Sequence, residues 1–470
     1  MKMLNRPLSI LLSLIMVFSL FTIVPFEVSA ETTSVTYIDR SWDENTKTVV
    51  ETEMTLDDPP VFEQDYYTGN VEVGNGWLFV DRNITIDQTM YINDGYHVKL
   101  IIANGCTLTV KGGIYVRESA TFSVYGQQGD TGKLHATNEY DENLYSAIDG
   151  DDSARLNVYG ATIEAIGDNR LSAGISGNVT IYGGTVNATA GSSYGAGIGG
   201  SSHDSGENIT INGGEVTAIG GSDASGIGGG YEGNGGNISI NGGTVKAYGG
   251  PGAAGIGGGH GGSGGNITID GGDVTAYSTS EYEGIGNGDG AGIGGGIDGN
   301  GGNITITGGT VEAISYADGA GIGGGDTSEG IGGHGGDGGN ITIRGGKVTA
   351  ISVEGGAGIG GGYHGNGGTI NIYDGEINAR CNGEDFGDGA GIGGGDGGDG
   401  GTVHIYGGKI TAYADGESEG AAIGAGKGGS DGTLTIDNGL WVHTGVKPDS
   451  TDWRYRQNRA VQFNARVYPQ

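Results

Sequence analysis

Aromatic and acidic side chains gather in three insertions of this chain, and that combination is typical of sugar binding. The insertions span residues 277–291, 380–390 and 413–420. Aromatic rings stack on the apolar faces of sugars, and carboxylates accept hydrogen bonds from sugar hydroxyls. The candidate binding residues are Tyr248, Tyr277, Tyr282, Phe386, Tyr413, Glu283, Asp289, Glu384 and Asp388. The alternative is a set of solvated loops whose acids serve only solubility.

Catalytic residues are harder to identify. Lys347, Glu376 and Lys409 occupy one position in successive repeats. A polysaccharide lyase would need such a base near acidic metal ligands. Alternating charges on adjacent strands also form a salt-bridge ladder, and that is the interpretation we favour. We assign no catalytic residue.

Calcium is the one cofactor that the sequence leaves as an alternative. His334 and His364 fall on neighbouring repeats near Asp326 and Asp337, and these residue types are metal ligands. Residues 332–337 and 394–399 resemble the start of the calcium-binding nonapeptide. Both lack the apolar residue two places after the Asp, and neither recurs every nine residues.

The candidate side chains lie within a sequence repeat, which must fold into the elements that position them. Its commonest length is 29 residues, as from Ile211 to Ile240 and on to Ile269. A Gly-Ile-Gly block, a block such as Ile209-Thr210-Ile211, and a block such as Val216-Thr217-Ala218 recur in order. The last two alternate apolar with polar residues, as a strand with one buried face does. Glycine pairs separate the blocks where turns need positive φ.

The repeat predicts an all-β fold, a right-handed parallel β-helix with three short strands per coil of about 29 residues, capped at both ends. Residues 1–30 are interpreted as a signal peptide and 31–69 as an N-terminal extension. Residues 70–145 form a cap and the first irregular coils, 146–443 the glycine-rich repeats, and 444–470 the C-terminal cap.

Composition and charge exclude some functions. The chain has 22 Lys+Arg against 56 Asp+Glu, a net charge of −34, which repels nucleic acid and disfavours anionic glycans unless a cation bridges the two.

About eight coils, or ~38 Å, separate Cys106 from Cys381, so we expect no disulfide between them.

The N-terminus predicts export. A basic start with Lys2 and Arg6 precedes an apolar run from Leu8 to Val24, and Val28-Ser29-Ala30 fits a cleavage site after Ala30. We expect a secreted, extracellular monomer that has no membrane contact after cleavage. Association of this monomer with the cell surface is an alternative.

The repeat is similar to that of secreted, adhesin-like proteins of Gram-positive bacteria. The resemblance rests on Ala-Gly-Ile-Gly-Gly-Gly (291–296, 320–325, 357–362, 390–395) with Gly-Gly-Asn-Ile-Thr-Ile-x-Gly-Gly (301–309, 338–346), and on the lead-in at 100–110 and 125–127. It spans roughly residues 70–440 and implies a β-solenoid surface protein of a carbohydrate-binding type, without a catalytic motif. The chain departs from the pattern in having no apparent wall anchor.

Three functions follow as hypotheses. The first is a non-catalytic extracellular β-solenoid that binds polysaccharide or a cell-surface glycan, or acts as an adhesin. The second is a β-helix polysaccharide lyase or glycoside hydrolase. The third is a structural or ice-binding solenoid, for which the Thr180, Thr210, Thr268, Thr305 and Thr342 column is the relevant feature.

Overall fold

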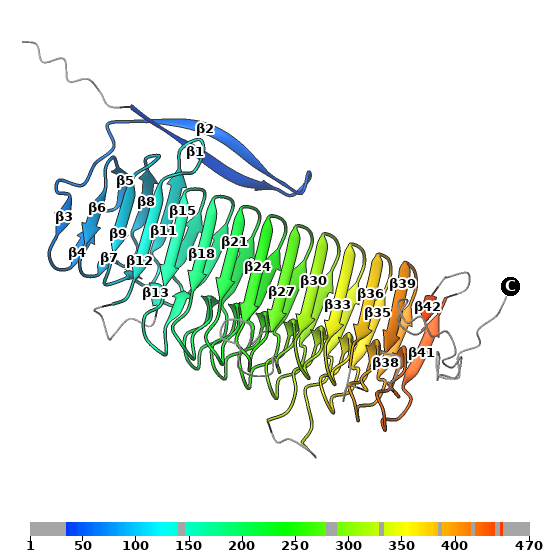
Figure 1. The fold of residues 1–470 in the computed structure, drawn as a ribbon. Helices are drawn as coiled ribbons and strands as arrows, with labels where there is room; N and C mark the ends of the chain where they lie inside the picture. The colour runs from blue at the N-terminus through cyan, green and yellow to red at the C-terminus, as the bar shows by residue number, and fades with distance from the viewer. Residues whose placement is uncertain are drawn as a thin grey trace, which may run out of the picture.

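Three parallel β-sheets form the sides of a long solenoid (Figure 1). The computed structural model describes residues 34–139, 146–278, 289–328, 333–383, 388–414, 419–437 and 442–444. Each coil contributes one strand to each sheet, and every strand between the two ends of a sheet pairs in parallel with the strands of the coils before and after it. This confirms the predicted parallel β-helix with three strands per coil, while its right-handedness stays a prediction.

The sheets are named here in the order in which a coil visits them after β3. Sheet I contains β4 (Val71–Val73), β7 (Met90–Ile92), β10 (Ile114–Val116), β13 (Ser146–Gly150), β16 (Ala173–Ile175), β19 (Ile198–Gly199), β22 (Ile227–Gly228), β25 (Ile256–Gly257), β28 (Ile293–Gly294), β31 (Ile322–Gly323), β34 (Ile359–Gly360), β37 (Ile392–Gly393) and β40 (Ile423–Gly424). Sheet II contains β5 (Gly76–Val80), β8 (His97–Ile102), β11 (Thr121–Gly126), β14 (Arg155–Val158), β17 (Asn178–Ile181), β20 (Asn208–Ile211), β23 (Asn237–Ile240), β26 (Asn266–Ile269), β29 (Asn303–Ile306), β32 (Asn340–Ile343), β35 (Thr369–Ile372), β38 (Thr402–Ile405) and β41 (Thr433–Ile436). Sheet III contains β3 (Tyr66–Tyr67), β6 (Ile84–Ile86), β9 (Thr107–Val110), β12 (Lys133–Thr137), β15 (Thr162–Ile166), β18 (Thr185–Thr189), β21 (Glu215–Ile219), β24 (Thr244–Gly249), β27 (Asp273–Ser278), β30 (Thr310–Ser315), β33 (Lys347–Ser352), β36 (Glu376–Cys381), β39 (Lys409–Ala414) and β42 (Val442–Thr444).

Like side chains stack on like in the interior. One coil buries Ile293 from sheet I, Ile304 and Ile306 from sheet II, and Val311 and Ala313 from sheet III, each at most 1% exposed. The register places each beside its counterpart in the next coil. Alternate residues therefore face outward, and the scaffold presents them in straight columns along its axis.

Glycine is required where sheet I turns toward sheet II. Gly294 has φ of +141°, and a Cβ atom there would lie 1.9 Å from the carbonyl oxygen of Gly323 in the next coil. The same position is glycine in every coil from Gly199 to Gly424. A side chain at this corner would push the coils apart.

Residues 34–57 form an antiparallel hairpin of β1 (Ser34–Asp43) and β2 (Thr48–Asp57), which lies along the side of the solenoid (Figure 1). Sequence analysis assigned no structure to this extension. Tyr37 packs against Trp77 and Tyr125, with ring centroids 4.8 and 5.2 Å apart. Arg40 is 8% exposed and binds Asp130 at 2.7 Å. The hairpin is thus fixed to the outer face of the first coils.

Other expectations can be compared with the structure. Neither Cys106 nor Cys381 forms a disulfide bond, as predicted. Lys409 Nζ lies 2.6 Å from Glu376 Oε1, which confirms this ion pair of the predicted salt-bridge ladder, and Lys347 is the register neighbour of Glu376 on the other side. Among the residues described, no helix has the length and apolar character needed to cross a membrane. The predicted signal peptide and the segment 445–470 lie outside the described residues.

Candidate functional site

The structure brings together two of the predicted aromatic residues. Tyr248 in β24 and Tyr277 in β27 are register partners, and their ring centroids are 5.8 Å apart. Tyr277 also meets Tyr316 edge-on at 5.7 Å and donates its hydroxyl to Glu312 at 2.6 Å. Burial and Glu312 raise the pKa of the Tyr277 hydroxyl. These rings form a cluster on the outer face of sheet III.

The remaining predicted residues do not extend that cluster. Tyr413 is only 6% exposed and pairs with Arg380, so its ring offers no open stacking face, contrary to its predicted role. Asp388 binds Lys427 at 2.6 Å through one oxygen and accepts the Glu419 N–H at 2.8 Å through the other. Four further candidates lie outside the described residues: Tyr282, Glu283, Glu384 and Phe386. The three insertions do follow strands of one sheet, β27, β36 and β39, as expected.

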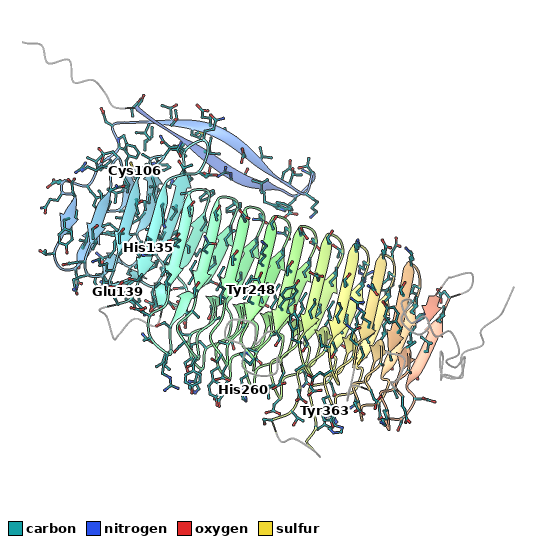
Figure 2. The ribbon with its side chains drawn as sticks, in the orientation of Figure 1. Cys106, His135, Glu139, Tyr248, His260 and Tyr363 are labelled. Atoms are coloured by element: carbon teal, nitrogen blue, oxygen red, sulfur yellow. The ribbon has the colours of Figure 1, made fainter. Side chains whose placement is uncertain are left out.

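Asp289 belongs to a different group of acids. Asp289, Asp318 and Asp326 each place a carboxylate oxygen within 4.8 Å of the other two. Tyr363 donates its backbone N–H to the Asp318 carbonyl, and Figure 2 shows Tyr363 at the looped edge of the solenoid, away from Tyr248. The acid group and the tyrosine cluster are therefore separate features.

Burial raises the pKa of all three carboxyls, and repulsion within the group adds to the rise for Asp289 and Asp326. Burial, reinforced by repulsion from Asp318, raises the pKa of Asp289 to about 7. Burial with repulsion from both partners raises the pKa of Asp326 to about 8. Three oxygen ligands at this spacing could hold a hard divalent cation such as Ca²⁺. Asp326 was expected near a metal together with His334, but the His334 ring is hydrogen-bonded to the Gly335 carbonyl at 2.9 Å.

A separate hollow of about 460 Å³ lies over the early coils. It combines two tyrosines with five carboxylates. Its lining consists of Tyr91, Tyr115, Asp149, Gly150, Asp151, Asp152, Ser176, Gly177, Gly199, Gly200, Ser201, Asp204, Ser205 and Glu207. None of these residues was a sequence-based candidate.

The hollow arises from a change of side-chain size along one outward column of sheet I. Tyr91 pairs with Tyr115, and Tyr115 pairs with Asp149 in the next coil. Asp149 is followed by Ser176, whose hydroxyl donates to it at 2.6 Å. From Gly199 onward the column has no side chain. The tyrosine rings therefore occur only near the start of this column, and the smaller residues that follow them leave the hollow open.

Polar contacts hold the aromatic side of the hollow in place. The Tyr115 hydroxyl donates to Asp151 at 2.8 Å, and burial beside Asp151 raises the pKa of this phenol to about 12. The rings of Tyr91 and Tyr115 meet edge-on at 6.0 Å, and the Arg117 guanidinium lies 5.1 Å from the Tyr91 ring. The rings are therefore fixed before any ligand arrives.

Asp152, Asp204 and Glu207 make another part of the lining acidic. Burial and the nearby charge of Asp152 raise the pKa values of both Asp204 and Glu207. A hydroxyl or a cation entering here would meet carboxylates that are incompletely solvated. The site therefore favours ligands rich in hydrogen-bond donors over anions.

A sequence signal for the hollow does exist. Aligning Ile92, Val116 and Gly150 as the ends of equivalent strands reveals the Tyr-Tyr-Asp column. The irregular early coils lack the glycine code that made the later repeats easy to align. The column was missed for that reason.

Comparison with known proteins supports the fold. The model of a family described as beta helix repeat matches residues 179–202, 209–231, 238–260, 267–297, 304–326, 341–363, 370–396 and 400–427. The matched segments correspond to coils of the solenoid. No match was found among curated proteins or among solved structures.

Proposed function

We propose that this protein is a non-catalytic extracellular β-solenoid that binds polysaccharide. The observation that carries the proposal is the hollow in which Tyr91 and Tyr115 face five carboxylates. Ring surfaces beside hydrogen-bond acceptors suit sugars, whose rings have apolar faces and hydroxyl rims. The expected ligand is a glycan of a polymer or a cell surface, and an adhesin would use the same chemistry.

The charge of the site favours neutral glycans. The chain carries a net charge of −34, and the hollow adds acids without a lysine in its lining. An anionic glycan would be repelled unless a divalent cation screened the acids. We therefore expect neutral glycans to bind without calcium and anionic ones only with it.

Affinity electrophoresis through neutral and acidic polysaccharides, with calcium or a chelator, tests the proposal. Tyr91→Ala combined with Tyr115→Ala should abolish retention while the melting temperature stays near that of the wild type, because both rings point away from the core. Tyr248→Ala with Tyr277→Ala is the matched control, and it should retain binding. Loss of retention in the control alone would move the site to sheet III.

A second candidate, glycoside hydrolysis in the same hollow, has one specific observation in its favour. The raised pKa of Glu207 suits a general acid, and the hollow supplies further carboxylates for a second catalytic role. Release of reducing ends from a bound glycan, lost in Glu207→Gln, would establish this activity. Binding without such release supports the non-catalytic proposal.

A further inference from the structure

The outer face of sheet II carries a continuous ladder of asparagines. From Asn208 onward, the side-chain Nδ2 of each asparagine donates to the Oδ1 of the asparagine in the preceding coil, at 2.6 Å for Asn208 and between 2.9 and 3.0 Å beyond it. The members of this ladder are Asn178, Asn208, Asn237, Asn266, Asn303 and Asn340. All but Asn178 are exposed.

A hydroxyl column runs parallel to the ladder, two residues further along each strand. It consists of Thr180, Thr210, Ser239, Thr268, Thr305 and Thr342, which are neighbours in register. Neighbouring coils are ~4.8 Å apart. Each coil thus presents one amide and one hydroxyl at the same height on a flat face.

The ladder leaves hydrogen-bonding capacity unused. A primary amide has two N–H donors and two acceptor lone pairs, and each rung takes one of each. The inner members Asn208, Asn237, Asn266 and Asn303 therefore each keep one donor and one lone pair for a ligand, whereas Asn178 donates to the backbone oxygens of Asp152 and Ala154. Because the rungs fix the amide planes, these groups are oriented before binding, and little side-chain entropy is lost when a ligand arrives.

The face leads into the hollow. Asn178 Nδ2 donates to the backbone oxygen of Asp152 at 2.8 Å, and Glu207 directly precedes Asn208. Asp152 and Glu207 both line the hollow. The first rungs therefore border it, and a linear ligand along the ladder could place its end there.

The two columns are uncharged from Asn178 to Thr342. In a chain with a net charge of −34, a stretch of this length without charge selects a neutral partner. A sugar hydroxyl both donates and accepts, which matches what each rung offers. Fully extended β-1,4-linked sugars also advance by close to one coil spacing per residue, whereas α-1,4-linked chains curve away.

We propose that the Asn-Thr face binds a neutral, extended β-linked polysaccharide that lies along the solenoid axis, with about one sugar per coil and one end in the hollow. This inference rests on the proposed function and names its ligand class. Because each coil adds similar contacts, affinity should grow with the length of the sugar chain until the face is filled.

Isothermal titration with cellotriose, cellohexaose, maltotriose and maltohexaose tests the inference. We expect cellohexaose to bind at least about tenfold more tightly than cellotriose, since each rung contributes a modest hydrogen bond. The α-linked pair should show no such gain. Equal affinities for cellotriose and cellohexaose would overturn the inference.

Matched variants locate the effect. Asn266→Asp removes the donor to Asn237 and places a charge on the face, and it should lower cellohexaose affinity about five- to tenfold. Asn241→Asp makes the same chemical change in an amide pair with Asn212 at the turn beyond the face, and it should not. Thr268→Val preserves the β-branched shape if Asn266→Asp fails to fold, and it should also weaken binding.

The outcomes separate the two proposals. If Tyr115→Ala abolishes binding and Asn266→Asp leaves it intact, the inference fails while the proposed function stands. If Asn266→Asp removes the length dependence and Tyr115→Ala has no effect, the ladder binds glycan and the hollow does not. If no glycan of either linkage binds, and no polysaccharide retains the protein, both proposals fail.

Discussion

Single side chains of this protein show how strongly the rigid coils constrain their surroundings. Asp289, Asp318 and Asp326 are brought together from positions as far as 37 residues apart, and they cannot move away from one another's charge. Burial raises the pKa values of all three carboxyls, and repulsion from neighbouring carboxylates adds to the rise for Asp289 and Asp326.

This group makes stability depend on pH. The carboxyls of Asp289 and Asp326 have folded pKa values of about 7 and about 8, well above the ~3.9 of an unfolded Asp. The folded state therefore binds more protons than the unfolded state between these values, so its stability falls as pH rises from about 4 to about 8. Melting temperatures measured across that range should fall. Asp326→Asn should flatten the slope, Asp388→Asn should not, and an unchanged slope in Asp326→Asn would contradict the assignment.

A core position gives a second prediction at this scale. Ala276 is fully buried between Ala247 and Ala313. Ala276→Phe should overpack the coil and cost ~1–3 kcal/mol or more of unfolding free energy. Thr305→Phe, on the outer face of sheet II, should change it little. Equal losses of melting temperature in the two variants would contradict the assignment of Ala276 to the interior and Thr305 to the outer face.

Among the elements, the β1–β2 hairpin is held to the solenoid partly by the buried guanidinium of Arg40. The Arg40 guanidinium contacts Asp130, Glu51 and the carbonyl of Tyr159. Arg40→Ala should cost about 2 kcal/mol of docking free energy, because it leaves Asp130 without its charged partner. The three sheets do not use the hairpin for their pairing, so the melting of the solenoid should change little.

Limited proteolysis measures this docking. Trypsin should cleave Arg40→Ala after Lys47, in the hairpin turn, faster than it cleaves the wild type. Glu51→Gln is the control, because Glu51 is 60% exposed and its pair with Arg40 contributes little. Equal cleavage rates in Arg40→Ala and the wild type would show that the hairpin is held by other contacts.

The elements differ in how far sequence could predict them. The coils from Ile198 onward could be predicted because equivalent side chains of successive coils pack on one another, which requires the same residue type at each repeat position. The hairpin could not, since its position depends on contacts such as Arg40 with Asp130, 90 residues away. The hollow was missed because its Tyr91, Tyr115 and Asp149 column lies in the early coils, which lack the glycine pattern that aligns the later repeats.

At the scale of the whole molecule, the parallel stack fixes which residues can meet. Cys106 precedes β9 near one end of sheet III, and Cys381 ends β36 near the other. Nine strand spacings of ~4.8 Å separate these two strands, about 43 Å, whereas a disulfide needs Cα atoms within ~7 Å. Mass spectrometry of the unreduced protein should find both thiols free, and a crosslinked peptide joining them would contradict the stack.

The central claim is that the hollow of the early coils binds polysaccharide. Hydrogen-exchange mass spectrometry, with and without the neutral polysaccharide that retains the protein most strongly, tests it most directly. The account predicts slower exchange in peptides covering residues 149–152 and 199–207, which line the hollow. Slower exchange confined to the insertions at 277–291, 380–390 and 413–420, with no change around the hollow, would contradict it.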